Sequence, residues 1–245
     1  FVISESLDQS NWTTLNQGSI TVTTVSNSGQ AISTVMTMDY SGSMSSTDIT
    51  NMESATTSFI NNMGSSDDAQ IVKFGEDVDV YQSFTSDKTL LVDAVNDGFS
   101  GDDGATALYD AVWAALTDLN TFGASGLKAV LAFTVGRDNT SSYTATDCIN
   151  YSNQNYIPIY SIGFGSADQT ALDALATSGV TEYAPDSSSL TEIYNQIANR
   201  MSETYVIDWE TIGSSGDTVY VRVTTTYESA NGVYTSTYLT SYSLN

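Results

Sequence analysis

The pattern of apolar and polar residues between Ala31 and Met201 switches between two periods, one typical of buried strands and the other of helices. Continuous apolar stretches, which indicate strands covered on both faces, are "AISTVMTM", "KAVLAFT" and "YIPIYSIGFG". The stretch "AQIVKFG" also predicts a strand, and "DVDVYQSF" alternates as a more exposed strand does. Five strands are therefore expected in this part of the chain.

Apolar residues at helical spacing mark the segments between these strands. The strongest example is residues 104–123, where Leu108, Val112 and Leu116 share one face and Gly123 follows as a stop signal. Other helices are predicted by "TDITNMESATTSFINNM", "DKTLLVDAVND", "DQTALDALATSG" and "SSLTEIYNQIANRM". Strands and helices that alternate over short links predict an α/β fold, a doubly wound and mainly parallel sheet with helices on both faces.

The two ends of the chain carry only strand-like patterns. The stretch "NQGSITVTTVSNSG" near the N-terminus alternates as a half-buried strand does, and "YVIDWETI" lies in the C-terminal part. Two further strands, joined through an Asn-Gly pair, predict a hairpin with Val219, Val221 and Val223 on one face.

Neither end can bury its apolar face alone, because an isolated hairpin is only marginally stable in water. We therefore expect residues 1–30 and 203–245 to form one small β module beside an α/β domain of residues 31–202. The N-terminal strand should pair with a strand from the C-terminal part, and Trp12 and Trp209 are the candidates for the shared core.

The charge of the chain is unusual, with 29 acidic against 6 basic residues and a net charge of -23. A surface this acidic repels nucleic acids and anionic membranes and attracts cations, so nucleic acid is not an expected partner. Hydrophobic residues make up 40% of the chain, which is ordinary for a globular protein and argues against disorder. No apolar run approaches the roughly 20 residues needed to cross a bilayer, so no membrane insertion is expected.

Catalytic chemistry finds little support in the residue types present. The chain has no histidine, which removes the Ser-His-Asp triad and histidine-zinc sites. No paired-carboxylate motif for acid–base work can be placed, so we expect a protein that is not an enzyme. The single cysteine, Cys148, excludes an internal disulfide framework and is expected to be a packed side chain. Abundant Ser, Thr and Tyr and a start at Phe1 suggest a mature product or a fragment of an extracytoplasmic protein.

Asp39, Ser41 and Ser43 form a candidate metal site directly after the first apolar strand, in "DYSGSMS". In an open parallel sheet, ligands bind beyond the carboxyl ends of the strands. The alternate spacing lets a tight loop aim three side chains at one point, and Gly42 lets the backbone come close. Carboxylate and hydroxyl oxygens suit a hard divalent cation. The same residue types also cap helices and form turns, so the motif alone leaves both interpretations open.

Three motifs in order give the chain a resemblance to a known family. The runs "DYSGSMS", "GATALYDAV" and "AVLAFTVGRDN" occur as in the von Willebrand factor type A domain, which the chain resembles over roughly residues 31–201. That family carries a metal-ion-dependent adhesion site, which implies Mg2+, or else Mn2+ or Ca2+, as a cofactor here. The resemblance also implies that Asp39, Ser41 and Ser43 are metal ligands from the first loop and Thr106 a ligand from the second.

The third loop departs from the family pattern. Where the family has Thr-Asp-Gly, this chain has Thr-Val-Gly with Val135 in the middle, and a valine can neither accept a hydrogen bond nor balance a cation. Either the site is lost, by nature or by engineering, or another carboxylate supplies the oxygen; the candidates are Asp138, Asp102 and Asp103. We expect a weakened or inactive site, because a neighbour three residues away rarely points at the same spot.

The resemblance implies a binding function. Proteins of this family typically use the cation to coordinate a carboxylate on a partner, so the expected partner is an extracellular protein or surface ligand that presents a carboxylate. An acidic chain with a β flank is most like the ligand-binding part of a microbial adhesin or pilus-like protein at the cell surface. Two alternatives remain open, a structural spacer module of a surface protein and a chelatase-type assembly subunit.

Overall fold

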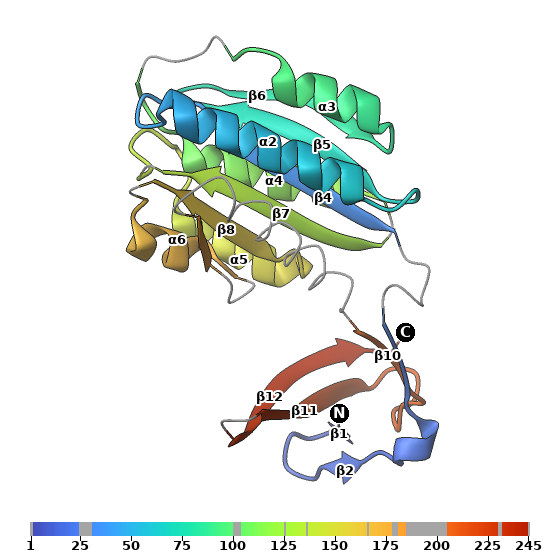
Figure 1. Cartoon of the computed structure of the whole chain (residues 1–245). Coiled ribbons are helices and arrows are strands. Elements are labelled where there is room, and N and C mark those ends of the chain that lie inside the picture. Colours follow the sequence, from blue (N-terminus) through green and yellow to red (C-terminus); the bar gives the residue numbers. More distant parts are fainter. Residues whose placement is uncertain are drawn as a thin grey trace. The chain divides into compact units, whose positions relative to one another are not determined.

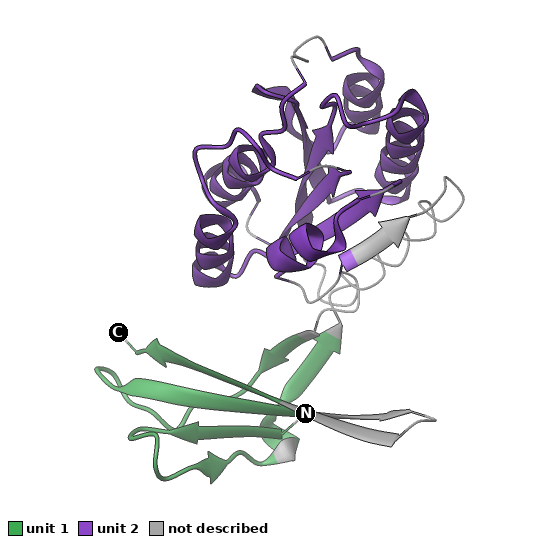
Figure 2. Cartoon of the chain, turned by 90° about the vertical axis from the view of Figure 1, so that its left-hand side faces the viewer, with its two compact units in different colours: residues 1–28, 204–245 green, residues 29–203 purple. Residues whose placement is uncertain are grey.

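The computed structural model describes residues 2–24, 31–99, 104–124, 126–135, 137–165, 167–177, 181–184, 205–229 and 232–244. The chain divides into two compact units, the smaller made of residues 1–28 and 204–245 and the larger of residues 29–203 (Figure 2). Each unit has a hydrophobic core of its own.

The larger unit is built on a sheet whose six described strands have the order β6-β5-β4-β7-β8-β9. Five of them are parallel, and β6 at one edge runs antiparallel to β5. The mainly parallel, doubly wound sheet predicted from the sequence is therefore confirmed. The strands are β4 (Ile32–Asp39), β5 (Asp68–Phe74), β6 (Val78–Thr85), β7 (Leu127–Thr134), β8 (Ile159–Phe164) and β9 (Thr181–Ala184).

Helices cover both faces of this sheet (Figure 1). On one face α2 and α3 pack over Met36 and Ile71, and on the other α4, α5 and α6 pack over Val35 and Val72. Because neighbouring residues of a strand point to opposite faces, a strand covered on both sides is buried along its length, as β4 is from Ser33 to Asp39. The helices are α2 (Ser46–Asn62), α3 (Lys88–Asn96), α4 (Leu108–Phe122), α5 (Ala145–Asn155) and α6 (Gln169–Leu175).

The helix α5 has no counterpart in the sequence prediction. Of its residues only Cys148 and Ser152 are buried, so it lacks the apolar stripe by which the other helices were predicted. Its signal lies at the start, where Thr144 and Asp147 form a capping box. The helix predicted over residues 188–201 lies outside the described residues.

The smaller unit is all-β, and its strands come from both ends of the chain. One sheet has the order β12-β11-β1-β2, and a separate antiparallel pair joins β3 to β10. The predicted pairing of the N-terminal strand with a C-terminal one is confirmed, as is the β11–β12 hairpin. The strands are β1 (Val2–Ser6), β2 (Thr13–Thr14), β3 (Thr21–Thr24), β10 (Tyr205–Asp208), β11 (Thr218–Ser229) and β12 (Gly232–Ser243).

The core of the smaller unit combines residues from both chain ends. It comprises Ile3, Leu15, Val219 and Val221, with Val223 and Trp209 among the residues packed against it. The predictions for the valine face and for Trp209 are confirmed. The prediction for Trp12 is wrong, because its ring lies beneath the guanidinium of Arg222, 4.0 Å from the ring centroid, and its indole N–H donates to the carbonyl of Gln9. A cation–π contact near the surface thus takes the place of burial.

Glu5 on β1 is a fully buried side chain that accepts four hydrogen bonds. Its Oε1 accepts the indole N–H of Trp209 and the hydroxyl of Tyr242, both at 2.8 Å. Its Oε2 accepts the backbone N–H of Ile212 at 2.7 Å and the hydroxyl of Thr211 at 3.2 Å. One N-terminal side chain therefore holds two separate parts of the C-terminal segment, residues 209–212 and Tyr242 on β12.

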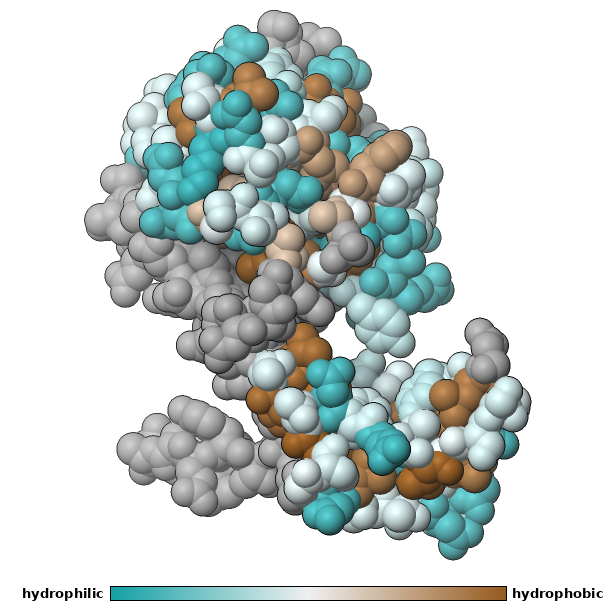
Figure 3. Space-filling view, turned by 90° about the vertical axis from the view of Figure 1, so that its right-hand side faces the viewer, coloured by the Kyte–Doolittle hydropathy of each residue, from teal (hydrophilic) through white to brown (hydrophobic). Residues whose placement is uncertain are grey.

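The surface of the larger unit is mostly hydrophilic on the face shown in Figure 3, where apolar residues are scattered rather than gathered. This distribution agrees with the excess of acidic residues in the sequence. Among the described residues, no helix combines the length and the apolar character that a membrane span requires.

We expect Glu5→Gln to destabilise the smaller unit by roughly 2–3 kcal/mol, because an amide nitrogen would replace one acceptor and face buried donors. Chemical unfolding followed by the fluorescence of Trp209 measures this loss. Glu210→Gln is the matched control, since Glu210 is exposed and lies next to Trp209. Equal unfolding midpoints for the two variants would show that the Glu5 carboxylate does not hold the unit together.

Cys148 should be chemically silent in the folded protein. Its side chain is fully buried, its Sγ lies 3.4 Å from the carbonyl oxygen of Tyr109, and burial raises the pKa of the thiol to about 12. The thiolate is the reactive form, so an aromatic disulfide reagent at about pH 8 should label the protein only after denaturant unfolds it. Rapid labelling of the native protein would contradict the burial of this residue.

Candidate functional site

The candidate residues lie beyond the carboxyl ends of the central strands. β4 is flanked by β5 on one side and by β7 on the other, so the strand order reverses at β4. Asp39 is the last residue of β4, and Thr134 is the last residue of β7. In open α/β sheets this reversal leaves the crevice in which ligands bind.

Asp39 is fully buried, and donors from the ends of both strands hold its carboxylate. Its Oδ1 accepts the backbone N–H of Ser41 at 2.8 Å, and its Oδ2 accepts the hydroxyl of Thr134 at 2.5 Å. The backbone N–H of Val135 donates to the same carboxylate. Burial raises the pKa of Asp39, and these hydrogen bonds act in the opposite direction. The carboxylate is therefore an internal link between the loops after β4 and β7.

Ser41 and Ser43 lie on a tight turn between β4 and α2. Their hydroxyl oxygens are 3.0 Å apart, and Ser41 is buried whereas Ser43 is exposed. The N–H of Met44 closes the turn by donating to the carbonyl of Ser41 at 2.9 Å. Ser45 then begins α2 with a capping box to Asp48. The turn thus presents two neighbouring hydroxyls, one of them open to solvent.

Thr106 reaches the same rim from the segment before α4, and it is buried. Its N–H donates to Oδ1 of Asn139 at 2.8 Å, and its carbonyl accepts the N–H of Asn139 at 3.1 Å. The N–H of Ala107 donates to the carbonyl of Gly75 at 2.7 Å. The carbonyl of Phe74, the last residue of β5, accepts the N–H of Tyr40 at 2.7 Å. The Thr106 loop and the Asp39 loop are therefore anchored on the same corner of the chain.

Asp138 makes its hydrogen bonds to α4 and to its own loop. Its Oδ2 accepts the N–H of Tyr109 at 3.0 Å, its Oδ1 accepts the N–H of Ser141 at 3.3 Å, and the hydroxyl of Ser141 donates to Oδ2 as well. The N-cap residue of α4, Ala107, has no side-chain cap. Asp138 therefore supplies the acceptor that a capping residue would supply.

Val135 packs against the apolar core on the α2 side of the sheet, in the cluster that contains Phe133 and Phe164. Its backbone N–H donates a hydrogen bond to Asp39, whereas its side chain provides no oxygen that could be a metal ligand. Asp102 and Asp103, the other candidates for a replacement carboxylate, lie outside the described residues.

The candidates named from the sequence omit two residues that hold this arrangement together. Thr134 donates its hydroxyl to Asp39, and the side chain of Asn139 holds the Thr106 loop. The signal for Thr134 is a lone hydroxyl that closes the apolar run "AVLAFT". Asn139 has no comparable local signal, because its partner is 33 residues away and only the fold brings the two together.

The candidate ligands are one carboxylate and three hydroxyls, from Asp39, Ser41, Ser43 and Thr106. Oxygen ligands of this kind suit a hard divalent cation. Within the described part of the chain, no three or more Asp, Glu, His or Cys residues come together as a metal-holding group. The ligand chemistry therefore fits a hard cation in type, while the charge it offers is low.

The sequence profile of the von Willebrand factor type A domain matches residues 35–196. Its range spans more than half of the chain and includes Asp39, Ser41, Ser43, Thr106 and Asp138. No curated protein matches the sequence.

Several solved structures have the same fold at low sequence identity. The vWF domain of the type V pili tip protein Mfa5 from Porphyromonas gingivalis is 12% identical, with a TM-score of 0.61 over 70% of this chain and 95% of that one. BatB from Bacteroides thetaiotaomicron is 14% identical, with a TM-score of 0.61 over 71% and 100%. Proximal thread matrix protein 1 from the mussel byssus, with a zinc-occupied MIDAS motif, is 14% identical, with a TM-score of 0.64 over 78% and 49%.

This chain thus matches about half of the mussel protein and the full length of the BatB structure. Identities this low establish a shared fold and no more. The profile match carries the assignment: this chain belongs to the von Willebrand factor type A domain family.

Proposed function

We propose that this chain is an extracellular binding module at a microbial cell surface, which takes a carboxylate of its partner through a divalent cation. The α/β domain of residues 31–202 would carry the site, flanked by the β module of residues 1–30 and 203–245. The observation that supports this best is the shared anchoring of the Asp39 and Thr106 loops at the carboxyl edge of the sheet. The pilus tip protein Mfa5 carries a domain of the same fold, which supports a surface role.

Asp39, Ser41, Ser43 and Thr106 are the residues that would hold the cation, Mg2+ first and Mn2+ or Ca2+ otherwise. When bound, such a cation supplies an electrophilic position for a carboxylate oxygen of the partner. In this arrangement Asp39 balances charge, and the Thr134 hydroxyl keeps its carboxylate oriented. The exposed hydroxyl of Ser43 would mark the side from which a partner approaches.

Val135 is expected to leave this cation site weak or inactive. A single carboxylate would face two positive charges, and the number of charged ligands is a main determinant of cation affinity. That carboxylate already accepts hydrogen bonds on both oxygens from protein donors. The carboxylate of Asp138 accepts a hydrogen bond from the N–H of Tyr109 at the start of α4, so it is already used in capping that helix.

A structural spacer is the second candidate, and the packing of Val135 favours it. A rim that is closed by an apolar contact does not need a cation in order to be stable. The mussel protein of the same fold is a thread matrix protein, which shows that the fold also occurs in a matrix component. Capture of extracellular proteins or glycans on immobilised protein, with and without chelator, separates a binder from a spacer.

The decisive variant for the proposed function is Val135→Asp. A second carboxylate balances the positive charge that Asp39 alone leaves uncompensated, so we expect Mg2+ and Mn2+ to bind about 10–100-fold more tightly than to the unsubstituted chain. Isothermal titration calorimetry of both proteins measures the difference. Val135→Asn is the matched control, because it has the shape of aspartate without its charge and should gain little.

Two results would contradict this proposal. Absence of binding by Val135→Asp would remove the cation site from the function altogether. Equal and tight binding by all three proteins would mean that another carboxylate already completes the site, and Asp138→Asn would then be the variant to titrate.

The stability of Val135→Asp should depend on the cation in a way that the unsubstituted chain does not. Without metal, a second carboxylate beside Asp39 brings like charges together and replaces an apolar contact, so its melting temperature should be the lower of the two. Saturating Mg2+ should raise it through mass action, whereas the valine form should change little. Melting curves with chelator and with Mg2+ test this ranking, and an unchanged difference between the two conditions would contradict it.

A further inference from the structure

Lys73 is a fully buried lysine in the core of the α/β unit. It lies on β5, next to the strand's last residue, Phe74. Its ammonium donates to the carbonyl of Val95 at 3.0 Å and to the carbonyl of Asp97, which is the C-cap residue of α3. Lysine is almost never fully buried unless its charge has partners, so these contacts need a physical reason.

Two aromatic rings complete the surroundings of the ammonium. Nζ of Lys73 lies 4.8 Å from the ring centroid of Tyr40 and 4.6 Å from that of Tyr81. The ring of Phe99 packs on both, with centroid distances of 5.4 Å and 6.0 Å. The hydroxyl of Tyr40 in turn donates to Oε1 of Glu53 on α2, at 2.9 Å. The ammonium therefore links the end of α3, β6 and the loop after β4 directly, through hydrogen bonds and cation–π contacts, and α2 indirectly through Tyr40.

Apolar packing does not account for this arrangement. Burial lowers the pKa of Lys73, and the carboxylates of Glu53 and Asp97 act in the opposite direction. An apolar side chain of similar length would fill the same space without that desolvation. What the ammonium adds is directed donors at the C-terminal end of a helix, where carbonyls lack intrahelical partners and positive charge is favoured.

The groups that Lys73 contacts lead directly into the candidate site. Tyr40 lies between Asp39 and Ser41, so the aromatic ring of Tyr40 that contacts the Lys73 ammonium belongs to the first loop of the site. Lys73 also lies two residues before Gly75, whose carbonyl accepts the N–H of Ala107, the residue after Thr106. Lys73 thus contacts the first loop and lies on the strand end that anchors the second.

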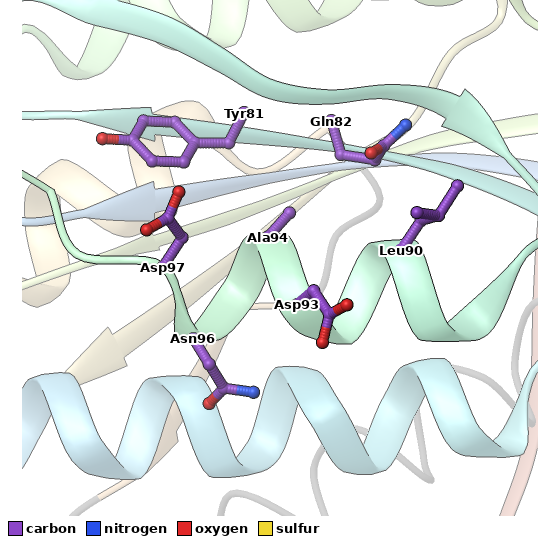
Figure 4. A pocket seen from close by; sticks show the side chains of 7 residues that line it. All are labelled: Tyr81, Gln82, Leu90, Asp93, Ala94, Asn96 and Asp97. Atoms are coloured by element: carbon purple, nitrogen blue, oxygen red, sulfur yellow. The ribbon is translucent and has the colours of Figure 1, made fainter.

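A hollow beside this contact leaves the end of α3 partly open. Figure 4 shows Tyr81 on β6 and Asp97 at the end of α3 on opposite sides of it, and its volume is about 450 Å³. Both residues also contact Lys73. The last turn of α3 is open on this side, and on its inner side the buried side chain of Val95 and the ammonium of Lys73 hold it in place.

We propose that Lys73 is a positioning residue of the candidate site, because its buried ammonium holds the ring of Tyr40 and the end of α3 against the end of β5, where the carbonyls of Phe74 and Gly75 anchor the Asp39 and Thr106 loops. The site it positions is the one in the proposed function, on which this inference rests. The positioning itself requires no bound cation and can be measured in metal-free protein.

Lys88 offers a matched control on the same unit. Its ammonium donates to the carbonyls of Asn61 at 2.9 Å and Met63 at 2.6 Å, at the C-terminal end of α2. α2 begins just after Ser43, so its C-terminal end lies at the opposite edge of the sheet from the candidate site. Lys88→Met therefore removes the same kind of contact away from the site.

Amide hydrogen exchange of the metal-free protein, followed by NMR, tests the role of Lys73. In Lys73→Met we expect exchange at Tyr40, Asp97 and Ala107 to rise roughly tenfold to hundredfold, because local opening no longer breaks hydrogen bonds to a charge. In Lys88→Met these three amides should be unchanged, and the amide of Met63 should exchange faster instead.

A rise of equal size at both edges of the sheet in Lys73→Met, or no rise at the rim, would overturn the proposal and make Lys73 an ordinary part of the core. If Lys73→Met does not fold, Tyr81→Leu takes its place, because it keeps the lysine and removes one ring. The same three amides should then exchange faster by a smaller factor, and unchanged rates there would also overturn the proposal.

A second measurement separates this inference from the proposed function. In the Val135→Asp background, Lys73→Met should weaken Mn2+ binding by about tenfold or more, whereas Lys88→Met should leave it unchanged. Equal Mn2+ affinity with and without Lys73 would overturn the positioning role. If Val135→Asp binds no cation, the proposed function fails, and the exchange rates in metal-free protein still decide what Lys73 does.

Discussion

A carboxylate buried at the end of the central strand is the constraint on which the rim of this protein depends. Asp39 has no exposed surface, so its charge must be met by protein donors rather than by water. The Ser41 amide, the Thr134 hydroxyl and the Val135 amide meet it, and they come from the ends of two neighbouring strands. The loops after β4 and β7 are therefore held together before any ligand binds. A cation at this rim would have to share a carboxylate that the fold already uses.

Basic residues are scarce in this chain, with six against 29 acidic ones, and several of them have structural tasks. Lys73 and Lys88 donate to carbonyls at the C-terminal ends of α3 and α2, and Arg137 pairs with Asp168 at the start of α6. Arg222 lies over an aromatic ring in the β unit. Each of these four basic side chains thus lies where a helix end, a carboxylate or an aromatic ring offers negative potential. Apart from Glu5 and Asp39, the described acidic residues are exposed or partly exposed, and water and dissolved salt screen their mutual repulsion.

Val135 places an apolar side chain at the position where the family has an aspartate, so the chain loses a negative charge there and gains an apolar contact. A second buried carboxylate beside Asp39 would repel it unless a cation lay between them. The valine avoids that repulsion and adds an apolar contact to the core. The two functions proposed for this scaffold therefore differ in the charge that they require at a single position. Glu5 shows the alternative solution in the smaller unit, where four donors satisfy one buried carboxylate without any cation.

The sequence by itself determined the class of the fold, five of the six described strands and most of the helices of the α/β unit, and the hairpin, because hydrophobic periodicity is a local property; it did not reveal β9 (Thr181–Ala184). It also suggested the candidate ligands, Asp39, Ser41 and Ser43 from a loop motif and Thr106 from the family resemblance. It did not reveal α5, whose only strong signal is a capping box. Tertiary structure alone decided which residues support the candidates, because hydrogen-bond partners such as Thr134 and Asp39 are 95 residues apart. It also placed Trp12 under a guanidinium, although the sequence allowed it to lie in the core of the β unit. Likewise it placed Asp138 at the start of α4, although the sequence allowed it to be a metal ligand. Lys73 is the clearest example of a residue that only the tertiary structure explains. A charged residue is unexpected on a buried strand, and the two aromatic rings and the helix end around its ammonium account for it.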